Sequence, residues 1–454
     1  MLDKKVLVAG CGKSGICATE LLINKGQEVI LFDENKKNNL TEAKVRENLK
    51  AVGKSDKLKI ILGQLTEDIL EQISVMVISP GIPTDLPFVM SVREKHIPVW
   101  SEIELAYYYE KGTVVAITGT NGKTTTTSLV GEIMKAHNPK SFVVGNIGIP
   151  YTQQVVKTDE DSVTVAEVSS FQLETIIDFK PHVSAILNIT PDHLDRHYTF
   201  ENYATCKADV SKNQNNEDYV VVNYDDPETM KLVDKLPGNV VYFSRLQELD
   251  KGVFVKDGAI VIFDGNIEIK VLDLSDIKIL GNHNVENVLA AVAVTYYMGV
   301  PVETIEAVST SFMGVPHRIE YVKTVNGVEY YNDSKGTNPD AAIKGIQAMK
   351  SATYLIGGGY DKKSSYIEWI DSFEGKVKKL VLLGETAKDI NDAAKSRGFV
   401  DTVFVESLEE AVKYCHQHAE DGECVLLSPA CASWGMFDNY EQRGDMFKEY
   451  VNKL

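Results

Sequence analysis

VVAITGTNGKTTTTSLV, residues 114–130, decides the fold of this chain. Its β-branched start predicts a strand, its glycines predict a turn, and the residues after Gly-Lys-Thr predict a helix. The backbone N–H groups of such a turn and the helix dipole point at one place, where an anionic phosphate is stabilised. Lys123 adds a mobile positive charge, and Thr124 offers a hydroxyl to Mg²⁺. We therefore predict a phosphate-binding loop, in a shortened form because Gly119 and Gly122 enclose only Thr120 and Asn121.

Length and charge limit the classes of protein to which the chain can belong. Its 454 residues are too many for one hydrophobic core, and typical domain sizes predict about three domains. The 65 acidic residues exceed the 47 basic ones, and the net charge of −18 argues against nucleic-acid binding. No apolar run reaches the ~20 residues of a membrane span, and the first residues enter a predicted strand without a signal sequence. We expect a cytoplasmic protein with no membrane partner, whose six cysteines are reduced and buried.

Three series of strands and helices follow one another along the chain. Apolar runs such as KVLVAG, EVILFD and VMVISPG alternate with amphipathic helical segments, which predicts a parallel sheet covered on both faces. A second series opens at Thr113, and a third follows Gly314, where Asn326-Gly327 predicts a hairpin turn. We predict an α/β fold of three domains: an N-terminal Rossmann-like domain (1–99), a central P-loop ATPase-like domain with a mixed sheet (100–314), and a C-terminal Rossmann-like domain (315–454).

A second glycine motif, VLVAGCGKSG, lies near the N-terminus. Gly10, Gly12 and Gly15 form Gly-x-Gly-x-x-Gly between a predicted strand and a predicted helix, and Asp33 ends the next strand. By itself this pattern indicates NAD(H), but its geometry is specific only for a nucleotide diphosphate beside a helix N-terminus. NAD(H), another nucleotide-linked ligand and a ligand-free packing turn stay open at this point.

Further motifs follow the phosphate loop in a fixed order: GNIGIP, EVSSFQLET, NITPDHLDRH, NYATCK, GNHNVENVLAA, PHRIE, NDSKGTN and SPACASWGMFDNYEQRG. Across essentially the whole chain they resemble the Mur ligases of bacterial cell-wall synthesis, and the closing segment resembles the D-glutamate-adding branch of that family. TNPDAA has Asp340 where the diaminopimelate- or lysine-adding branch would show arginine. Folylpolyglutamate synthases, which lack the N-terminal nucleotide domain, are the alternative enzyme. A nucleotide-responsive binding protein without chemistry is the alternative of a different class.

The resemblance implies an ATP-dependent ligase. It implies that UDP-N-acetylmuramoyl-L-alanine is activated as an acyl phosphate and joined to D-glutamate, giving ADP and phosphate in peptidoglycan precursor synthesis. The expected cofactors are ATP and two Mg²⁺ ions, the expected partners are these small molecules, and the expected state is a monomer.

Several residues would hold ATP and metal. Lys123 and the loop amides supply the γ-phosphate cradle, unless the loop is only a glycine-rich packing turn. Glu167 and His193 follow predicted strands, at the sheet edge where open α/β folds bind ligands. By resemblance both are Mg²⁺ ligands, although a histidine in a loop can equally belong to a solvated turn. Lys207 by itself predicts a surface lysine on a helix, whereas the resemblance implies a carbamylated lysine that binds Mg²⁺.

The resemblance and the loop together give five sets of site residues. The catalytic residues are Lys123, Glu167, His193 and Lys207, and the metal ligands are Thr124, Glu167, His193 and Lys207. The ATP-binding residues are Gly119, Thr120, Asn121, Gly122, Lys123, Thr124, Thr125, Asn284, Asn287, Arg318 and Asp333. The residues for the UDP-sugar and its muramoyl-alanine end are Gly12, Lys13, Ser14, Asp33, Gly81, Asn146, Ser169 and Gln172, with His193 beside them. The residues for the incoming amino acid are Lys335, Thr337, Lys362 (or Lys363), Ser433 and Tyr440.

Overall fold

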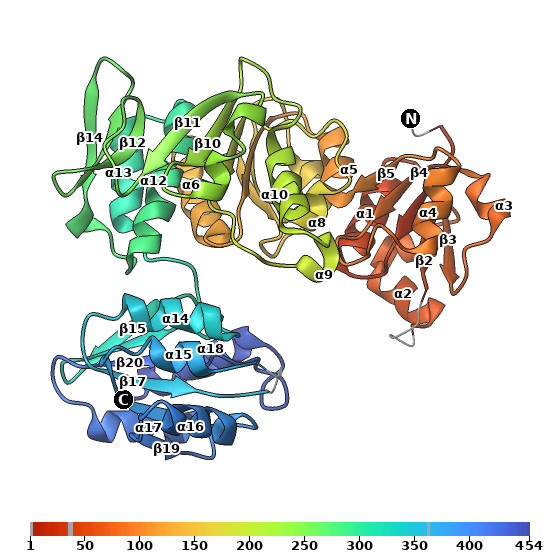
Figure 1. Ribbon diagram of the computed structural model, residues 1–454. Coiled ribbons are helices and arrows are strands. Elements are labelled where there is room, and N and C mark those ends of the chain that lie inside the picture. Colours follow the sequence, from red (N-terminus) through yellow and green to blue (C-terminus); the bar gives the residue numbers. More distant parts are fainter. Residues whose placement is uncertain (1–2, 35–39, 361–363) are drawn as a thin grey trace. The chain divides into compact units, whose positions relative to one another are not determined.

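The computed structural model describes residues 3–34, 40–360 and 364–454, and these form two compact units. The first unit contains Met1–Leu274 and Glu286–Ser309, and the second contains Ser275–Val285 and Thr310–Leu454. Figure 1 draws the first unit mainly in red to green and the second mainly in cyan to blue. Each unit is described by itself below.

The first sheet of the first unit has five parallel strands in the order β3-β2-β1-β4-β5. Its strands are β1 (Lys5–Ala9), β2 (Val29–Asp33), β3 (Leu58–Leu62), β4 (Ile73–Ile78) and β5 (Val99–Ser101). Its helices are α1 (Lys13–Asn24), α2 (Glu42–Asn48), α3 (Glu67–Leu70) and α4 (Pro87–Glu94), with the 3₁₀ turn η1 (Lys50–Lys54). This is the Rossmann-like sheet that the sequence predicts.

The second sheet of the first unit has nine strands in the order β14-β13-β12-β11-β10-β9-β6-β8-β7. The strands are β6 (Thr113–Thr118), β7 (Ser141–Gly145), β8 (Val163–Glu167), β9 (Val183–Ile186), β10 (Tyr219–Asn223), β11 (Asn239–Ser244), β12 (Gly252–Lys256), β13 (Ala259–Phe263) and β14 (Glu268–Asp273). Strands β7 to β12 pair in parallel, whereas β13 and β14 are antiparallel additions at the end. The mixed character expected for the central sheet is confirmed.

Helices of very different length follow the strands of the second sheet. The α-helices are α5 (Glu102–Tyr109), α6 (Lys123–His137), α7 (Tyr151–Gln154), α8 (Ser170–Leu173), α9 (Leu194–His197), α10 (Phe200–Ala208), α11 (Pro227–Met230), α12 (Asn282–Tyr297) and α13 (Val302–Ser311). The 3₁₀ turns are η2 (Val155–Lys157), η3 (Asp209–Ser211), η4 (Val233–Lys235) and η5 (Leu274–Asp276).

The second unit is built on a sheet in the order β15-β16-β20-β17-β18-β19. The antiparallel hairpin of β15 (Glu320–Val325) and β16 (Val328–Asn332) turns at Asn326 and Gly327, as the sequence predicts. The parallel strands are β17 (Thr353–Gly357), β18 (Val377–Leu382), β19 (Thr402–Phe404) and β20 (Cys424–Leu427), and the helices are α14 (Pro339–Ala348), α15 (Ile367–Asp371), α16 (Ala387–Ser396), α17 (Leu408–His418) and α18 (Tyr440–Asn452).

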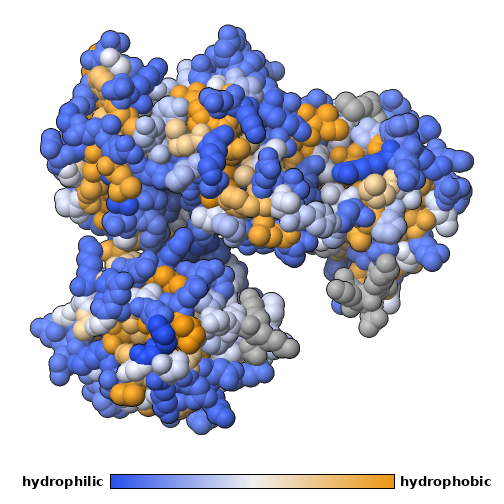
Figure 2. Space-filling view, viewed as in Figure 1, coloured by the Kyte–Doolittle hydropathy of each residue, from blue (hydrophilic) through white to orange (hydrophobic). Residues whose placement is uncertain are grey.

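Buried apolar side chains cover both faces of each sheet, as continuous apolar strands require. The visible surface is mostly hydrophilic with scattered hydrophobic patches (Figure 2). All six cysteines are free and buried, as expected. Among the described helices, none is both long enough and apolar enough to cross a membrane.

The expected domain boundaries stay predictions. Residue 99, the expected end of the first domain, is the first residue of β5. The first and second sheets belong to one compact unit because α5 follows β5 directly and packs against both α1 and α7.

Buried carboxylates on α5 join it to the second sheet. The Glu104 carboxylate, 2% exposed, accepts backbone hydrogen bonds from Ile177, Asp178 and Phe179 at 2.9, 2.8 and 3.0 Å. Glu102 Oε1 accepts two more from Thr152, from its backbone N–H and its hydroxyl, both at 2.7 Å. A buried carboxylate is stable only when its oxygens receive such donors, so these contacts fix α5 against the central strands.

Replacing Glu104 tests this attachment. Glu104→Gln should lower the free energy of unfolding of the first unit by about 1–3 kcal/mol, because an amide cannot accept all three buried N–H groups. Urea denaturation measures the change. Glu42→Gln is the control: it removes a surface partner of Arg46 and should cost less than about 0.5 kcal/mol. Equal losses in the two variants would show that the Glu104 contacts do not stabilise the unit.

Candidate active site

The phosphate loop leaves the C-terminal end of β6, which lies between β8 and β9 in the second sheet. The loop is held from below by Asn188, whose side chain accepts from Asn121 N at 2.8 Å and donates to Asn121 O at 3.1 Å. Helix α6 begins after Gly122, which has a φ of 83°. A Cβ atom there would lie 2.2 Å from Oδ1 of Asn287, so both the backbone angle and the close approach require glycine.

Lys123 folds back over its own loop. Its ammonium group donates to the carbonyl oxygens of Gly119 and Thr120, both at 2.8 Å. Thr124 and Thr125, the next residues of α6, are each 7% exposed. The positive charge is therefore held at the loop mouth, where the sequence predicts a γ-phosphate.

A pocket of about 310 Å³ opens beside this loop in the first unit. It is lined by Pro80, Gly81, Lys123, Asn146, Ser169, Ser170, Phe171, Asp192, His193, Tyr203 and Lys207. Six of the predicted site residues are among them: Gly81, Lys123, Asn146, Ser169, His193 and Lys207. Gly81 comes from the first sheet's domain and the others from the second sheet, so the pocket lies where these two parts of the first unit meet.

Lys207 is a buried lysine, and the alternative of a surface lysine on a helix is wrong. The residue is 1% exposed on α10, and its ammonium donates to Gly119 O at 2.7 Å. Nζ also lies 4.6 Å from the ring centroid of Tyr203, one helical turn earlier. Burial, together with the nearby charge of Lys123, lowers the pKa of Lys207 to about 7.

Glu167 ends strand β8 with one of its oxygens free of hydrogen bonds. Oε1 accepts from Asn146 Nδ2 at 2.8 Å, while the buried Oε2 has no hydrogen-bond partner among the residues that the structure describes. A buried carboxylate oxygen without a donor fits a cation, and with the Thr124 hydroxyl it supplies the oxygen ligands that Mg²⁺ prefers. The described chain shows no group of three His, Cys, Asp or Glu side chains around one point. Only two of the expected metal ligands, Glu167 and His193, are of these residue types. The other two expected ligands are Thr124 and Lys207.

His193 is held in a left-handed backbone conformation, with φ 51° and ψ 34°. Its ring lies 4.8 Å from the ring of Phe171, and its Nε2 lies 3.4 Å from Oδ2 of Asp192. His193 therefore belongs to the pocket lining and is exposed.

Ser169 and Gln172 cap helix α8. The Gln172 side-chain oxygen accepts from the backbone N–H and the hydroxyl of Ser169, both at 3.0 Å, and Ser169 Oγ accepts from Gln172 N at 3.4 Å. This capping box gives Gln172, 4% exposed, a structural role. Its expected contact with substrate stays a prediction.

The N-terminal glycine motif forms the turn between β1 and α1. Gly12 caps α1, the Lys13 ammonium donates to Gly148 O of the central part, and Ser14 is partly buried. Asp33 Oδ2 accepts from the backbone N–H of Cys11 at 3.0 Å. These residues meet at the C-terminal edge of the first sheet, the place where such sheets bind nucleotides.

Asn284 and Asn287 of α12 are buried, at 8% and 5% exposed. Within the second unit, Asn284 Nδ2 donates to Leu280 O at 2.7 Å. Within the first unit, Asn287 Oδ1 accepts from Thr126 Oγ1 at 3.3 Å, directly behind the phosphate loop.

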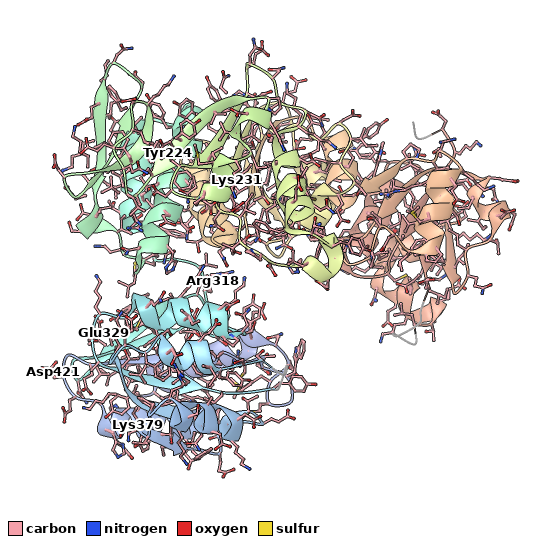
Figure 3. The ribbon with its side chains drawn as sticks, viewed as in Figure 1. Tyr224, Lys231, Arg318, Glu329, Lys379 and Asp421 are labelled. Atoms are coloured by element: carbon pink, nitrogen blue, oxygen red, sulfur yellow. The ribbon has the colours of Figure 1, made fainter. Side chains whose placement is uncertain are left out.

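The remaining predicted residues belong to the second unit. Arg318 lies in the loop before β15 (Figure 3) and is exposed. Asp333, after β16, is 6% exposed; its carboxylate accepts from Ser428 Oγ at 2.7 Å and from Ile319 N at 3.3 Å. Burial raises the pKa of Asp333 to about 7.

The residues expected around the amino acid lie at the same edge of the third sheet. The Lys335 ammonium is 5.4 Å from the ring centroid of Tyr440, the first residue of α18. Thr337 is partly exposed, and Ser433 is 4% exposed beside the bridge between Tyr360 and Ala432. Lys362 and its alternative Lys363 lie outside the described residues.

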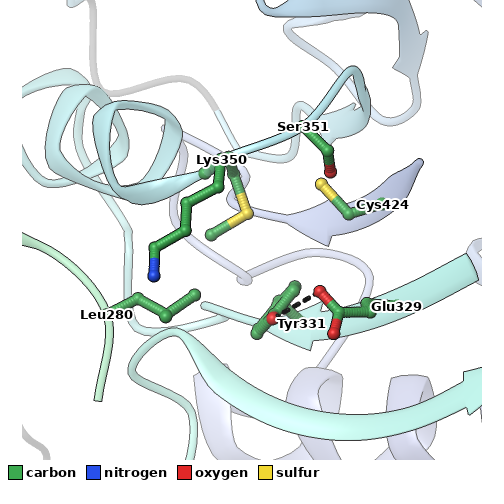
Figure 4. A pocket seen from close by; sticks show the side chains of 7 residues that line it. Leu280, Glu329, Tyr331, Lys350, Ser351 and Cys424 are labelled. Carbon is green, nitrogen blue, oxygen red and sulfur yellow. Dashed lines mark hydrogen bonds between the residues drawn. The ribbon is translucent and has the colours of Figure 1, made fainter. Parts of the chain in front are cut away.

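A second pocket, of about 180 Å³, lies at the opposite edge of the third sheet (Figure 4). It is lined by Leu280, Glu329, Tyr331, Met349, Lys350, Ser351 and Cys424. Glu329 accepts from the Tyr331 hydroxyl at 2.9 Å, and none of the predicted site residues is present. Because ligands of such sheets bind at the C-terminal strand edge, this pocket is not the candidate site.

Sequence reasoning missed five residues of the first pocket. The residues that line it without having been predicted are Pro80, Ser170, Phe171, Asp192 and Tyr203. Tyr203 precedes Lys207 by four residues on one helix, so helical spacing could have indicated it. Phe171 carried no such signal, because an aromatic residue in a short helix usually belongs to the core.

Comparison with known proteins covers nearly the whole chain. Residues 4–101 match the N-terminal domain of MurD-like Mur ligases, residues 117–295 the Mur ligase middle domain, and residues 317–431 the Mur ligase glutamate ligase domain. The chain is 53% identical to the UDP-N-acetylmuramoylalanine--D-glutamate ligase of Lachnoclostridium phytofermentans over 453 residues, which cover 100% of this chain and 99% of that protein. It is 52% identical to the protein of the same name from Lachnospira eligens, with the same coverage.

Solved structures show the same fold. The UDP-N-acetylmuramate-alanine ligase MurC of Thermotoga maritima has a TM-score of 0.60 at 20% identity, covering 99% of each chain. The MurF ligase of Thermotoga maritima, solved in complex with ADP, has a TM-score of 0.58 at 18% identity, covering 99% of this chain and 96% of its own. The phosphate loop, the pocket beside it and these full-length matches lead to one conclusion: the chain belongs to the Mur ligase family.

Proposed function

We propose that this chain is an ATP-dependent ligase that adds D-glutamate to UDP-N-acetylmuramoyl-L-alanine in peptidoglycan precursor synthesis. The observation that carries the proposal is the pocket of the first unit, where Lys123 of the phosphate loop and Gly81 of the Rossmann-like part line one space. Full-length identity of 53% to a D-glutamate ligase supports the choice of substrates. The first sheet is present, whereas folylpolyglutamate synthases are expected to lack it.

The reaction needs the carboxylate of the UDP-sugar to be activated before an amine can attack it. ATP transfers its γ-phosphoryl group to that carboxylate, giving an acyl phosphate and ADP; the amine of D-glutamate then displaces phosphate and forms the amide. Lys123 and the loop N–H groups stabilise charge on the transferring phosphoryl group. Because such transfer depends mainly on positioning, a pocket that holds the carboxylate opposite the loop is what the step requires.

Thr124, Glu167, His193 and the carbamate of Lys207 would hold Mg²⁺ in this proposal, with two ions expected. Bound there, the metal would neutralise charge between the nucleotide and the carboxylate. The chain's own part is to keep a buried acceptor in place: Asn146 holds one oxygen of Glu167 and leaves the other free. Asn146 and Ser169 are proposed to contact the muramoyl-alanine end from the same pocket.

Carbamylation of Lys207 suits the burial of its amine. The neutral amine attacks CO₂, forming an N–C bond and losing one proton, so a cation becomes an anionic oxygen donor. A lysine amine can do this only when unprotonated, and a pKa of about 7 leaves a large neutral fraction at physiological pH.

The remaining predicted site residues are proposed to contact the nucleoside of ATP, the UDP group and the incoming amino acid. Asn284, Asn287, Arg318 and Asp333 would contact the nucleoside of ATP, and Gly12, Lys13, Ser14 and Asp33 the UDP group. Lys335, Thr337, Ser433 and Tyr440, with Lys362 or Lys363, would receive D-glutamate, because cations and hydroxyls match two carboxylates. The monomeric state and the cytoplasmic location stay predictions.

An amino-acid panel tests the proposed reaction. Phosphate release with UDP-N-acetylmuramoyl-L-alanine, ATP and Mg²⁺ should be at least about 10²-fold faster with D-glutamate than with D-glutamine, L-lysine or meso-diaminopimelate, because a charge left unmatched in a closed site costs about 3–5 kcal/mol. Little phosphate release is expected with L-glutamate as well; this expectation comes from the family resemblance, since the two enantiomers carry the same charges. A preference for L-lysine would assign the enzyme to another branch of the family. Activity only with a folate substrate would replace the proposal by the folylpolyglutamate alternative.

Lys123 is the residue on which phosphoryl transfer should depend most. Lys123→Ala should lower kcat by about 10²-fold or more, since one stabiliser of transition-state charge is removed. Lys135→Ala, an exposed lysine on the same helix, is the control and should leave kcat unchanged. Near-normal ADP formation by Lys123→Ala would refute the assignment of the loop.

If Lys207 acts as a carbamate, the activity of the enzyme should depend on CO₂. Enzyme depleted of CO₂ and bicarbonate should lose activity and regain it on addition of CO₂, faster at pH 8 than at pH 6. At equal dissolved CO₂ the neutral amine fraction rises about tenfold between these values for a folded pKa near 7. Lys207→Arg should be inactive, whereas Lys212→Arg on the following turn should keep its CO₂ response. Full activity of Lys207→Arg would exclude the carbamate.

A further inference from the structure

Helix α9 (Leu194–His197) is a four-residue turn between two residues in unusual backbone conformations. His193 before it has a φ of 51°, and Tyr198 after it has a φ of 66°. Residues with such angles cost about 1–3 kcal/mol each unless their surroundings hold them there. One helical turn has almost no stability of its own. Other contacts must therefore fix α9, and with it the backbone of His193.

An ion pair within the first unit supplies the strongest of these contacts. Arg196 on α9 binds Glu174 through two bonds, Nε to Oε1 at 3.1 Å and Nη2 to Oε2 at 2.7 Å. The two side chains are only 11% and 14% exposed. Such a two-point pair fixes the orientation of the guanidinium as well as its position.

Arg196 also lies against the ring that supports His193. Its Cζ is 4.7 Å from the centroid of the Phe171 ring, and the His193 ring is 4.8 Å from the same centroid. His197, at the end of α9, stacks on Phe171 at 5.6 Å and bonds Ser170 Oγ through Nε2 at 3.0 Å. Displacement of Arg196 would therefore remove a packing contact of the Phe171 ring. The Phe171 ring could then shift and no longer hold the His193 ring in place.

The same turn reaches the loop after β4 in the Rossmann-like part. Arg196 Nη1 lies 3.5 Å from Pro80 O, a long hydrogen bond. The Tyr198 hydroxyl donates to the Asp85 carboxylate at the other end of that loop. Pro80 and Gly81 line the pocket opposite Lys123. α9 therefore contacts both the His193 side and the Gly81 side of one pocket.

We infer that Arg196, held by Glu174, is a positioning residue that sets the distance between His193 and the Pro80–Gly81 loop. The inference rests on the proposed function, since it assigns that pocket to the UDP-sugar substrate. Arg196 touches neither the phosphate loop nor the predicted amino-acid residues among the contacts of the described chain. Replacing Arg196 should therefore weaken binding of the UDP-sugar and slow the step that uses His193. It should leave binding of the nucleotide and of D-glutamate unchanged.

A matched ion pair elsewhere in the chain provides the control. Arg397 and Asp371 form the same two-point geometry in the second unit, Nε to Oδ1 at 2.6 Å and Nη2 to Oδ2 at 2.9 Å. That pair is 48% and 42% exposed, and neither residue lines either of the two pockets described above. Arg397→Lys therefore removes the same bonds without touching a pocket.

The experiment uses the full chain in four forms: wild type, Arg196→Lys, Glu174→Gln and the double variant, with Arg397→Lys beside them. Calorimetry without nucleotide or metal measures binding of UDP-N-acetylmuramoyl-L-alanine, and steady-state kinetics give kcat and the KM of each substrate. Arg196→Lys should lower kcat/KM for the UDP-sugar by about 10–100-fold, the usual loss when a supporting contact of a site residue is removed. Its KM for ATP and D-glutamate should change less than about twofold, within ordinary surface effects.

The double variant separates positioning from simple loss of stability. Because the two residues act as one unit, Arg196→Lys with Glu174→Gln should lose no more than the worse single variant. If Arg196→Lys does not fold, the nearly isosteric Glu174→Gln gives the same comparison. Unchanged UDP-sugar affinity in a folded variant, or equal increases in all three KM values, would overturn the inference. Failure of the wild type to use D-glutamate would instead overturn the proposed function, while calorimetry would still report on Arg196.

Discussion

Two lysine ammonium groups donate to one carbonyl oxygen, that of Gly119. Lys123 reaches it at 2.8 Å from α6 and Lys207 at 2.7 Å from α10. Two cations this close repel each other, and burial strengthens the repulsion because the local dielectric is low. An anion in the loop, or a neutral amine at Lys207, would relieve this repulsion. Burial and the nearby charge of Lys123 together hold the pKa of Lys207 below its ordinary value.

The order of strands explains how this crowding arises. β6 is an interior strand of the second sheet, with β8 on one side and β9 on the other. Glu167 ends β8, and the segment with His193 follows β9, so parallel pairing brings three loops that are far apart in the sequence to one edge of the sheet. The antiparallel strands β13 and β14 lie at the far end of the sheet and leave this edge unchanged.

Polar contacts add to apolar packing in holding the parts of the first unit together. Glu104 and Glu102 of α5 bind backbone N–H groups of the central part. The Arg196–Pro80 and Tyr198–Asp85 contacts join the central part to the Rossmann-like part beside the pocket. Polar contacts of this kind have strict geometry, so they fix orientation more sharply than hydrophobic contacts, which are non-directional.

The sequence by itself determined the fold class, the hairpin at Asn326-Gly327 and the phosphate loop, because each depends on local chemistry: residue periodicity, positive φ at glycine, and amides at a helix start. Family motifs also identified Lys123, His193 and Lys207, which the structure brings into one pocket. Only the tertiary structure decided that Lys207 is buried, that Gln172 caps α8, and that Tyr203 and Phe171 line the pocket. The attachment of α5 and the Arg196–Glu174 pair were equally invisible in the sequence, because partners 22 or more than 70 residues apart meet only through strand order. Burial and long-range pairing depend on how the sheets close around a residue, and no local pattern contains that information.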